Sequence, residues 1–143
     1  MQRRSGFFAA ILAASLIGGL ASAARADDSR AGEVQATISA QIDAFSHDDG
    51  AKAYSLAAPG IQMMFPSPDA FMAMVKGGYA PVYHPQQFQF SDFRAEGDRL
   101  VQAVDITASD GTSWIAEYTL SRAADGSLRI EACKLSKRPG VGA

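Results

Sequence analysis

The hydrophobic period of this chain changes close to Pro85, and that change constrains its fold more than any other feature. Within residues 33–46 the apolar positions are three or four residues apart, which is typical of one face of an α-helix. They are Val34, Ile38, Ile42 and Phe45. Beyond Pro85 apolar and polar residues alternate, a period of two that indicates β-strands. Helices followed by strands predict the α+β class.

Two further helices are expected before Pro85. A polar turn at residues 47–50 ends the first helix, and Asp48 or Asp49 can cap the second, residues 51–58, which should end at a Pro-Gly pair. Ser67 can cap a third helix, with proline at its first position and an acid in its first turn, that runs to a Gly-Gly pair. Residues 61–65 fit either a short strand or a turn of helix.

Four antiparallel strands are expected after Pro85, joined as a meander. Two Asp-Gly pairs, at residues 110–111 and 125–126, are strong hairpin signals. We expect a two-residue loop at the first pair and a three-residue loop, residues 124–126, at the second. The expected strands cover residues 87–91, 100–108, 112–122 and 128–135.

The loop lengths determine which side chains share a face, because a shift of one residue moves a whole strand to the opposite side. In this register Leu120 lies opposite Val101 and Ile130, and Tyr118 lies opposite Ala132. The face expected under the helices is Val101, Ala103, Trp114, Ala116, Tyr118, Leu120, Leu128, Ile130 and Ala132, with Asp105 and Thr107 as polar exceptions. The opposite face carries Leu100, Gln102, Val104, Ile106, Ile115, Glu117 and Thr119. It is half apolar, so we expect a homodimer through the sheet.

The first 26 residues carry the pattern of a secretory signal peptide. Arg3 and Arg4 form a positive n-region, residues 7–23 are uncharged, and Ala24-Arg25-Ala26 offers a small-x-small cleavage site. We therefore expect cleavage after Ala26, a periplasmic or secreted protein, and no membrane association after cleavage. The alternative is an uncleaved membrane anchor, for which this stretch lies at the lower limit of length.

Cleavage would also change the charge of the chain. Removing residues 1–26 takes away three arginines and no acid, so the formal net charge falls from −2 to −5. An acidic surface repels phosphate backbones, and nucleic acid is therefore not an expected partner. The remaining chain is expected to form one domain, residues 27–136, and a disordered tail, residues 137–143.

Several short strings carry a resemblance. They are QIDAF at residues 41–45, DDG at 48–50, AY at 53–54, APGIQ at 58–62, FMAMV at 71–75, GYAPVY at 78–83 and DGSLRI at 125–130, with Cys133 beyond. They resemble an exported bacterial family known only as domain of unknown function 4864, and the order of elements resembles the NTF2-like α+β cone. The resemblance implies that fold and export. It implies no activity, because NTF2-like domains include isomerases, dehydratases, ligand-binding pockets and associative modules.

Asp105 is the one candidate for catalysis, and it is a weak one. On the expected apolar face it lies near Trp114 and Tyr118, where burial would raise the pKa of its carboxyl and suit a general base. A tyrosine hydroxyl there could stabilise an enolate oxygen, as in the NTF2-like ketosteroid isomerase. The alternative is that Asp105 lies at the end of the sheet and bonds a hairpin or solvent, which avoids a costly buried charge.

Aromatic and methionine side chains are the candidates for ligand binding. Tyr79 and Tyr83, with His84, form an aromatic run with polar tips that can line the mouth of a cone. Methionines near residues 63–74 adapt to irregular apolar shapes. The alternatives are a rigid aromatic wall and ordinary core filling. The candidate ligand-binding residues are Met63, Tyr79, Tyr83, Trp114 and Tyr118.

Neither a metal nor a cofactor is expected. His47, Asp48 and Asp49 are of metal-binding type, but adjacent residues seldom converge on one ion, and helix capping explains them better. The common nucleotide-binding, hydrolase and zinc-protease motifs do not occur after residue 26. Cys133 is the sole cysteine, and we expect it to be buried and unreactive; a disulfide between chains or a redox role is the alternative.

The sequence therefore predicts a non-catalytic domain that binds a small apolar or amphipathic ligand in its cone. Two alternatives remain open. One is a homodimeric interaction module, and the other is an isomerase-like or dehydratase-like enzyme that uses Asp105.

Overall fold

Residues 18–140 are described by the computed structural model, and within them every helix precedes every strand. The helices are α1 (Gly18–Ser46), α2 (Gly50–Ser55), α3 (Pro59–Met64), α4 (Pro68–Gly78) and α5 (Ala80–Tyr83). The strands are β1 (Gln87–Glu96), β2 (Arg99–Thr107), β3 (Ser113–Arg122) and β4 (Leu128–Lys137). The α+β class is thus confirmed. Most of the expected signal peptide, residues 1–17, and the end of the expected tail, residues 141–143, lie outside the described residues.

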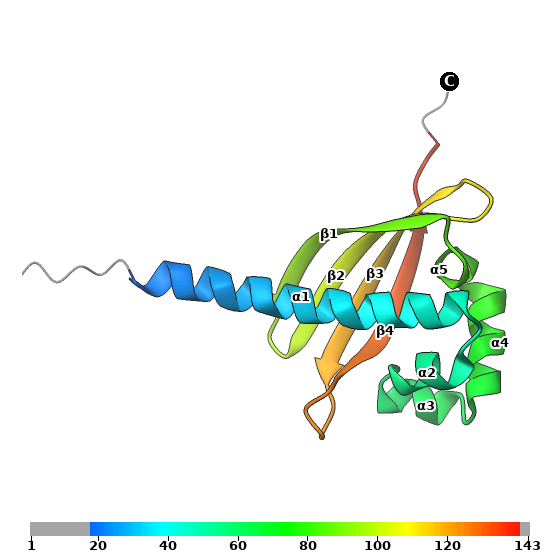
Figure 1. Ribbon diagram of the computed structural model, residues 1–143, viewed down its shortest axis with the longest axis horizontal. Coiled ribbons are helices and arrows are strands. Elements are labelled where there is room, and N and C mark those ends of the chain that lie inside the picture. The colour runs from blue at the N-terminus through cyan, green and yellow to red at the C-terminus, as the bar shows by residue number, and fades with distance from the viewer. Residues whose placement is uncertain (1–17, 141–143) are drawn as a thin grey trace, which may run out of the picture.

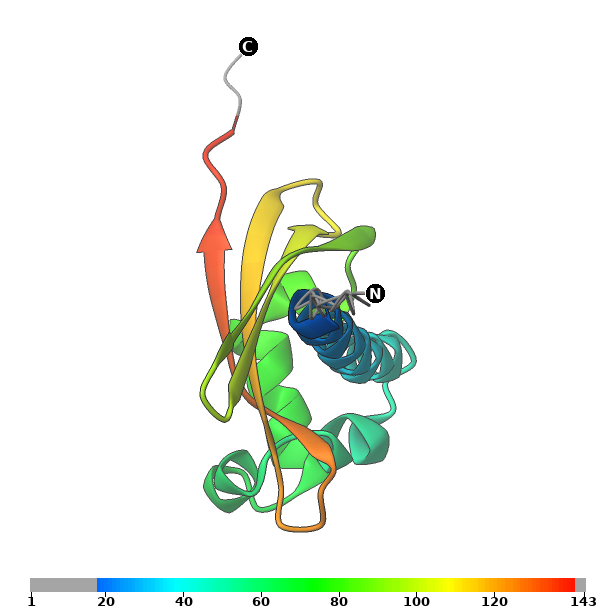
Figure 2. The same cartoon turned by 90° about the vertical axis from the view of Figure 1, so that its left-hand side faces the viewer.

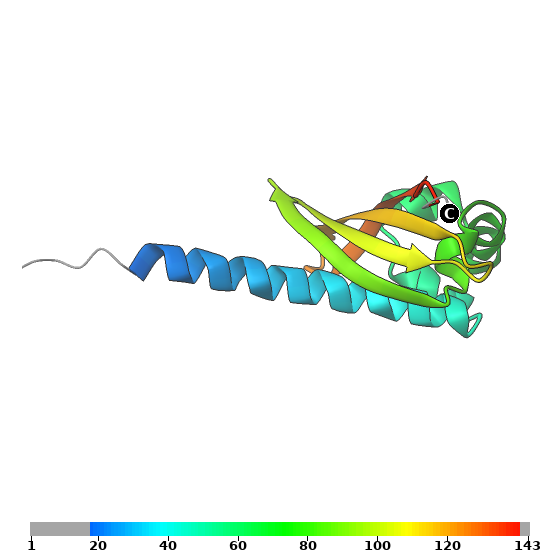
Figure 3. The same ribbon diagram turned by 90° about the horizontal axis from the view of Figure 1, so that it is seen from above.

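The strands form one antiparallel sheet in the order β1-β2-β3-β4, as a meander (Figure 1). Helix α1 runs across the sheet, and its N-terminal part projects beyond it (Figure 1). Helix α1 lies across one side of the curved sheet, and the shorter helices gather at one end of it, which leaves most of the other side without a helix over it (Figures 2 and 3). We call the side that carries α1 the inner face and the other side the outer face.

The helices follow the local signals of the sequence. The apolar stripe of α1, Val34 to Phe45, is buried, as its spacing predicted. Asp49 caps α2 by accepting a hydrogen bond from the Lys52 amide (3.1 Å), and Ser67 caps α4 through the Ala70 amide (3.1 Å). Residues 61–64, which the sequence left undecided, are helical, because Pro59 begins α3 rather than ending a longer α2.

The first hairpin loop has three residues, and the expectation of two is wrong. The Ala108 amide donates to the Thr112 carbonyl (2.8 Å), which leaves residues 109–111 as the loop. Gly111 has φ +84°, a left-handed conformation that glycine adopts without steric cost. The extra loop residue shifts β2 by one position against β3, so that Leu100, rather than Val101, pairs with Leu120.

This shift reverses the two faces of β2. Its inner-face residues, all buried, are Leu100, Gln102, Val104 and Ile106. They pack beneath the helices with Ala116, Tyr118 and Leu120 of β3. Ala103, Asp105 and Thr107 lie instead on the outer face, with Ile115, Glu117 and Thr119 of β3. The half-apolar free face that included Val104 and Ile106 therefore does not exist in this register.

The last strand combines a confirmed loop with an unexpected bulge. Its hairpin has the expected three-residue loop, closed by the Ala123 amide and the Ser127 carbonyl (2.8 Å). Leu120 pairs with Ile130 as expected, but a bulge at Glu131 then adds one residue to β4. Tyr118 consequently pairs with Cys133 rather than with Ala132. The strand also continues to Lys137, two residues beyond its expected end.

Candidate functional site

An apolar pocket of about 350 Å³ lies between the helices and the edge strand β4, on the inner face. Helices α1, α3, α4 and α5 and strands β3 and β4 contribute to its wall. Its apolar lining is Phe45, Ile61, Met64, Phe65, Phe71, Met74, Val75, Tyr79, Val82, Ile130 and Ala132. Its polar or weakly polar lining is Gln41, Tyr118, Glu131 and Cys133. We call this hollow the apolar pocket.

Helix α4 supplies one wall because its apolar residues recur at helical spacing. Phe71, Met74 and Val75 are three and four residues apart, so they share the face that the helix turns toward the pocket. Phe71 is the centre of an aromatic cluster, with ring centroids 6.2 Å from Phe45 and 6.4 Å from Phe65. Rings at these distances pack favourably, and they give the pocket a firm apolar wall.

Tyr118 and Cys133, which face each other on paired strands, line the pocket; Cys133 was expected to be buried but is only partly so. Tyr118 is 1% exposed, and its hydroxyl makes no hydrogen bond to an oxygen or nitrogen within the described residues. Burial raises the pKa of that hydroxyl well above its ordinary value, and the facing Cys133 thiol raises it further. Burial likewise raises the pKa of the Cys133 thiol to about 12, while hydrogen bonding with Tyr118 lowers it by a smaller amount. The contact is weak, because sulfur is a poor hydrogen-bonding partner.

Gln41 is a third polar residue of the wall, and it is not one of the four apolar positions that predict the buried stripe of α1. It is buried, and its Nε2 donates to the Ala53 carbonyl of α2 (3.1 Å). Its spacing of three from both Ile38 and Ala44 puts it at the margin of the buried face. That spacing is a signal that could have predicted its burial.

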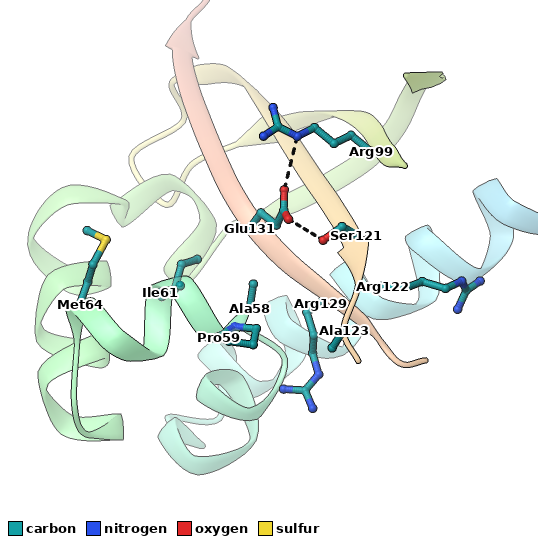
Figure 4. A pocket seen from close by; sticks show the side chains of 11 residues that line it. Ala58, Pro59, Ile61, Met64, Arg99, Ser121, Arg122, Ala123, Arg129 and Glu131 are labelled. Atoms are coloured by element: carbon teal, nitrogen blue, oxygen red, sulfur yellow. Dashed lines mark hydrogen bonds and ion pairs between the residues drawn. The ribbon is translucent and has the colours of Figure 1, made fainter. Parts of the chain in front are cut away.

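A second hollow, of about 530 Å³, adjoins the apolar pocket (Figure 4). We call it the arginine groove, since three arginines from β2, β3 and β4 line it. Ile61, Met64 and Glu131 line both hollows, so the two meet at α3 and at the bulge of β4. The remaining lining residues are Ala58, Pro59, Gly60, Arg99, Ser121, Arg122, Ala123 and Arg129.

The three arginines differ in the hydrogen bonds and ion pairs that their guanidinium groups make. Arg122 binds both carboxylate oxygens of Glu33, at 3.0 and 2.7 Å. Arg129 donates to the Ser55 carbonyl (2.8 Å) and contacts the Asp125 carboxylate (3.4 Å). Arg99 contacts only the Glu131 carboxylate among the described residues, at 3.8 Å, and its side chain is 70% exposed. No local pattern predicted that Arg99 would lie near Arg122 and Arg129, because more than 20 residues separate Arg99 from both along the chain.

The expected ligand-binding residues separate into two groups. Tyr79 and Tyr118 line the apolar pocket. Met63 is 85% exposed and does not line it; its neighbour Met64 does. The Tyr83 hydroxyl donates instead to the Asp48 carboxylate, and its ring stacks on His84 (4.0 Å between centroids). The indole of Trp114 donates to Thr112 (2.8 Å) at the hairpin, in a separate small hollow.

Asp105 does not lie in the apolar pocket, and its expected position beside Tyr118 is wrong. It is on the outer face, where Arg138 donates to its carboxylate (2.7 Å). The cause is the one-residue shift of β2. Among the described lining residues of the apolar pocket only Glu131 has a carboxyl group, and that carboxylate contacts Ser121 and Arg99, which do not line the pocket.

The metal-like run at residues 47–49 takes part in helix ends. His47 Nδ1 lies 2.9 Å from the Asp43 carbonyl, and Asp49 caps α2. Within residues 18–140 no group of three or more His, Cys, Asp or Glu side chains could hold a metal ion. No helix in the described part of the chain is both long and apolar enough to span a membrane.

Comparisons with known proteins support the fold and leave the activity open. A family model described as a domain of unknown function (DUF4864) matches residues 27–143. An NTF2-like protein of unknown function from Silicibacter pomeroyi DSS-3 is similar in structure, with a TM-score of 0.54 and 16% identity, covering 78% of this chain and 98% of that one. A protein from Catenulispora acidiphila gives a TM-score of 0.49 and 17% identity, covering 79% and 94%. A comparison with curated proteins finds no match.

Proposed function

Because the chain belongs to the family described as domain of unknown function DUF4864, whose name assigns no activity, we propose a function from the pocket itself. The protein is exported and binds a small apolar or amphipathic ligand in the apolar pocket without transforming it. The observation that carries this proposal is the pocket of about 350 Å³ at the helix–β4 edge. Its size lies within the range of small-molecule sites, and such sites combine an apolar lining with a few polar groups.

The polar groups of the lining favour binding over catalysis. General acid–base chemistry needs a titratable group that can reach the reacting atoms with a suitable pKa. The pKa values of Tyr118 and Cys133 are both raised by burial, so both groups keep their protons near neutral pH. Asp105 is on the outer face. Gln41, Tyr118 and Cys133 are therefore suited to orienting a ligand.

A binding assay with a blocked pocket tests this proposal. The probe is N-phenyl-1-naphthylamine, which is uncharged and fluoresces in apolar surroundings. Met74 is half-buried on the face of α4 that lines the pocket, so Met74→Trp should fill part of the pocket and weaken probe binding about tenfold or more. Ala95→Trp, at an exposed position of β1 remote from the pocket lining, is the matched control and should bind as wild type. Equal binding by both variants would contradict the proposal.

Export is tested separately. The family match begins at Asp27, the residue that the expected cleavage would leave first, and this supports cleavage after Ala26. N-terminal sequencing of protein recovered from its own cells should start at Asp27. Recovery of the full-length chain with the membrane fraction would instead support the uncleaved anchor.

A further inference from the structure

We propose that the ligand is an amphipathic anion: its apolar part occupies the apolar pocket, and Arg99 binds its anionic group where that pocket meets the arginine groove. This inference rests on the proposed function and adds the chemical class of the ligand. The first observation is the common wall. Ile61, Met64 and Glu131 line both hollows, so a molecule that fills the apolar pocket can extend past them to the arginines.

The second observation is the availability of one guanidinium. Figure 4 shows Arg122 and Arg129 directed away from Glu131, and each is held by the bonds described above. Arg99 leans toward Glu131, with 3.8 Å between Arg99 Nε and Glu131 Oε2. That distance is long for a charge-assisted hydrogen bond, which is about 2.7–2.9 Å. Arg99 therefore keeps its donors available beside Glu131, which lines both hollows.

Glu131 affects how tightly Arg99 can bind the anionic group. Its Oε1 accepts a hydrogen bond from Ser121, while its Oε2 makes the long contact with Arg99. An anionic group bound to Arg99 would replace this long contact with a shorter one. It would also experience repulsion from the Glu131 carboxylate. Removing the charge of Glu131 should consequently strengthen anion binding, which a purely structural role of the pair does not predict.

The two halves of the site select different properties of the ligand. A guanidinium matches the paired oxygens of a carboxylate, phosphate or sulfate. The apolar pocket adds affinity with each buried methylene, by about fourfold per group. A small inorganic anion lacks the apolar part, and an uncharged alcohol lacks the oxygens that Arg99 binds. The class that uses both halves is a medium-chain carboxylate or a similar amphiphile.

Displacement of N-phenyl-1-naphthylamine by decanoate and by decan-1-ol tests the proposal. The quantity of interest is the ratio of the two affinities, because both compounds carry the same chain length. In wild-type protein, decanoate should bind about five- to tenfold more tightly than the alcohol, allowing for the exposure of Arg99. Arg99→Gln should abolish this preference and leave decan-1-ol unaffected. Glu131→Gln should raise the affinity for decanoate about threefold and leave decan-1-ol unaffected.

Arg138→Gln is the matched control, since Arg138 is paired with Asp105 away from both hollows. It should keep the wild-type ratio. If Arg99→Gln leaves the ratio unchanged, or if Arg138→Gln lowers it equally, the inference fails while the proposed function stands. If neither compound displaces the probe from wild-type protein, and Met74→Trp binds the probe as wild type does, the proposed function fails as well.

Discussion

The inner and outer faces of the sheet are built from alternate residues of the same strands, but they contribute to the structure in different ways. On the inner face Val104, Ala116 and Leu120 are fully buried beneath the helices. On the outer face, ion pairs between exposed side chains reach across an intervening strand, Arg94 of β1 with Glu117 of β3 (3.6 Å) and Arg138, just after β4, with Asp105 of β2 (2.7 Å). A buried aliphatic side chain contributes about 1.5–3 kcal/mol, and an exposed ion pair about 0–1 kcal/mol. The fold therefore depends on the inner face.

The largest expected effect comes from placing the same charge on each face. Ile106 is on the inner face and 2% exposed, whereas Ile115 is half-buried on the outer face opposite Asp105. Ile106→Lys buries an unpaired charge and should cost about 4 kcal/mol or more, enough to unfold a marginal domain. Ile115→Lys should cost about 1 kcal/mol or less, because it can pair with Asp105. Urea denaturation measures both changes, and equal losses would contradict the assigned register.

The variant Ile115→Lys also tests the expectation of a dimer through the sheet. Helices cover the inner face, so self-association through the sheet would have to use the outer face (Figure 2). If wild-type protein is a dimer in sedimentation experiments, Ile115→Lys should weaken it. A dimer that is unaffected by Ile115→Lys uses another surface, and a wild-type monomer at high concentration contradicts the expectation itself.

Gln102 is the polar exception on the inner face. Its Nε2 donates to the carbonyls of Ser91 (3.2 Å) and Ala103 (2.8 Å), close to the bulge of β1, and its Oε1 accepts from Gln35 of α1 (3.2 Å). Gln102→Leu keeps the volume and removes these bonds. We expect a loss of about 1–3 kcal/mol in the free energy of unfolding. Thr119→Val on the outer face is the control and should change stability by less than about 0.5 kcal/mol.

Cys133 makes the inner face sensitive to high pH. Folding raises the pKa of its thiol from 9.0 to about 12, so the folded state holds this proton more tightly than the unfolded state. Its contribution to stability is complete below pH 9 and is lost as the pH rises toward 12. Wild-type protein should lose stability across this window more steeply than Cys133→Ala, in which the raised pKa of Tyr118 remains. Parallel pH profiles would contradict this assignment.

The same pKa predicts slow labelling of the thiol. Near pH 8 the folded protein carries on the order of a thousandfold less thiolate than the unfolded chain. Iodoacetamide should therefore label the native protein far more slowly than the protein in urea. Rapid labelling of native protein, or a dimer that is lost on reduction, would instead support the alternative of an exposed or intermolecular thiol.

Tyr118→Phe is expected to have the smallest effect. The Tyr118 hydroxyl is buried without an oxygen or nitrogen partner in the described residues, so its removal deletes no strong hydrogen bond. Stability in ligand-free protein should stay unchanged or rise by up to about 1 kcal/mol. Thermal unfolding measures the change. A clear loss of stability would mean that the hydroxyl has a good partner, such as a ligand retained through purification.

The sequence predicted residues of the candidate site only where neighbouring residues along the chain were enough to indicate what surrounds a side chain. Tyr79 and Tyr118 line the apolar pocket as expected. Met63 does not line it, whereas its neighbour Met64 does, because the sequence did not show which face α3 turns toward the pocket. Glu131 and Arg99 were not identified. Their proximity depends on the bulge of β4 and on strand pairing, which bring together residues that are distant in sequence. A pattern of neighbouring residues in the sequence cannot predict a contact of this kind.

By itself, the sequence determined what short-range physics controls. The change of hydrophobic period established the order of elements, the capping residues Asp49 and Ser67 established two helix starts, and the second Asp-Gly loop had its expected length. The tertiary structure decided which face of β2 is buried, where β4 bulges and which side chains meet in the pocket. The reason is that alternation has a period of two, so one extra residue in a loop exchanges the faces of a strand without altering its pattern. Packing against the helices selects the register, and Asp105 consequently lies outside while Val104 and Ile106 lie inside.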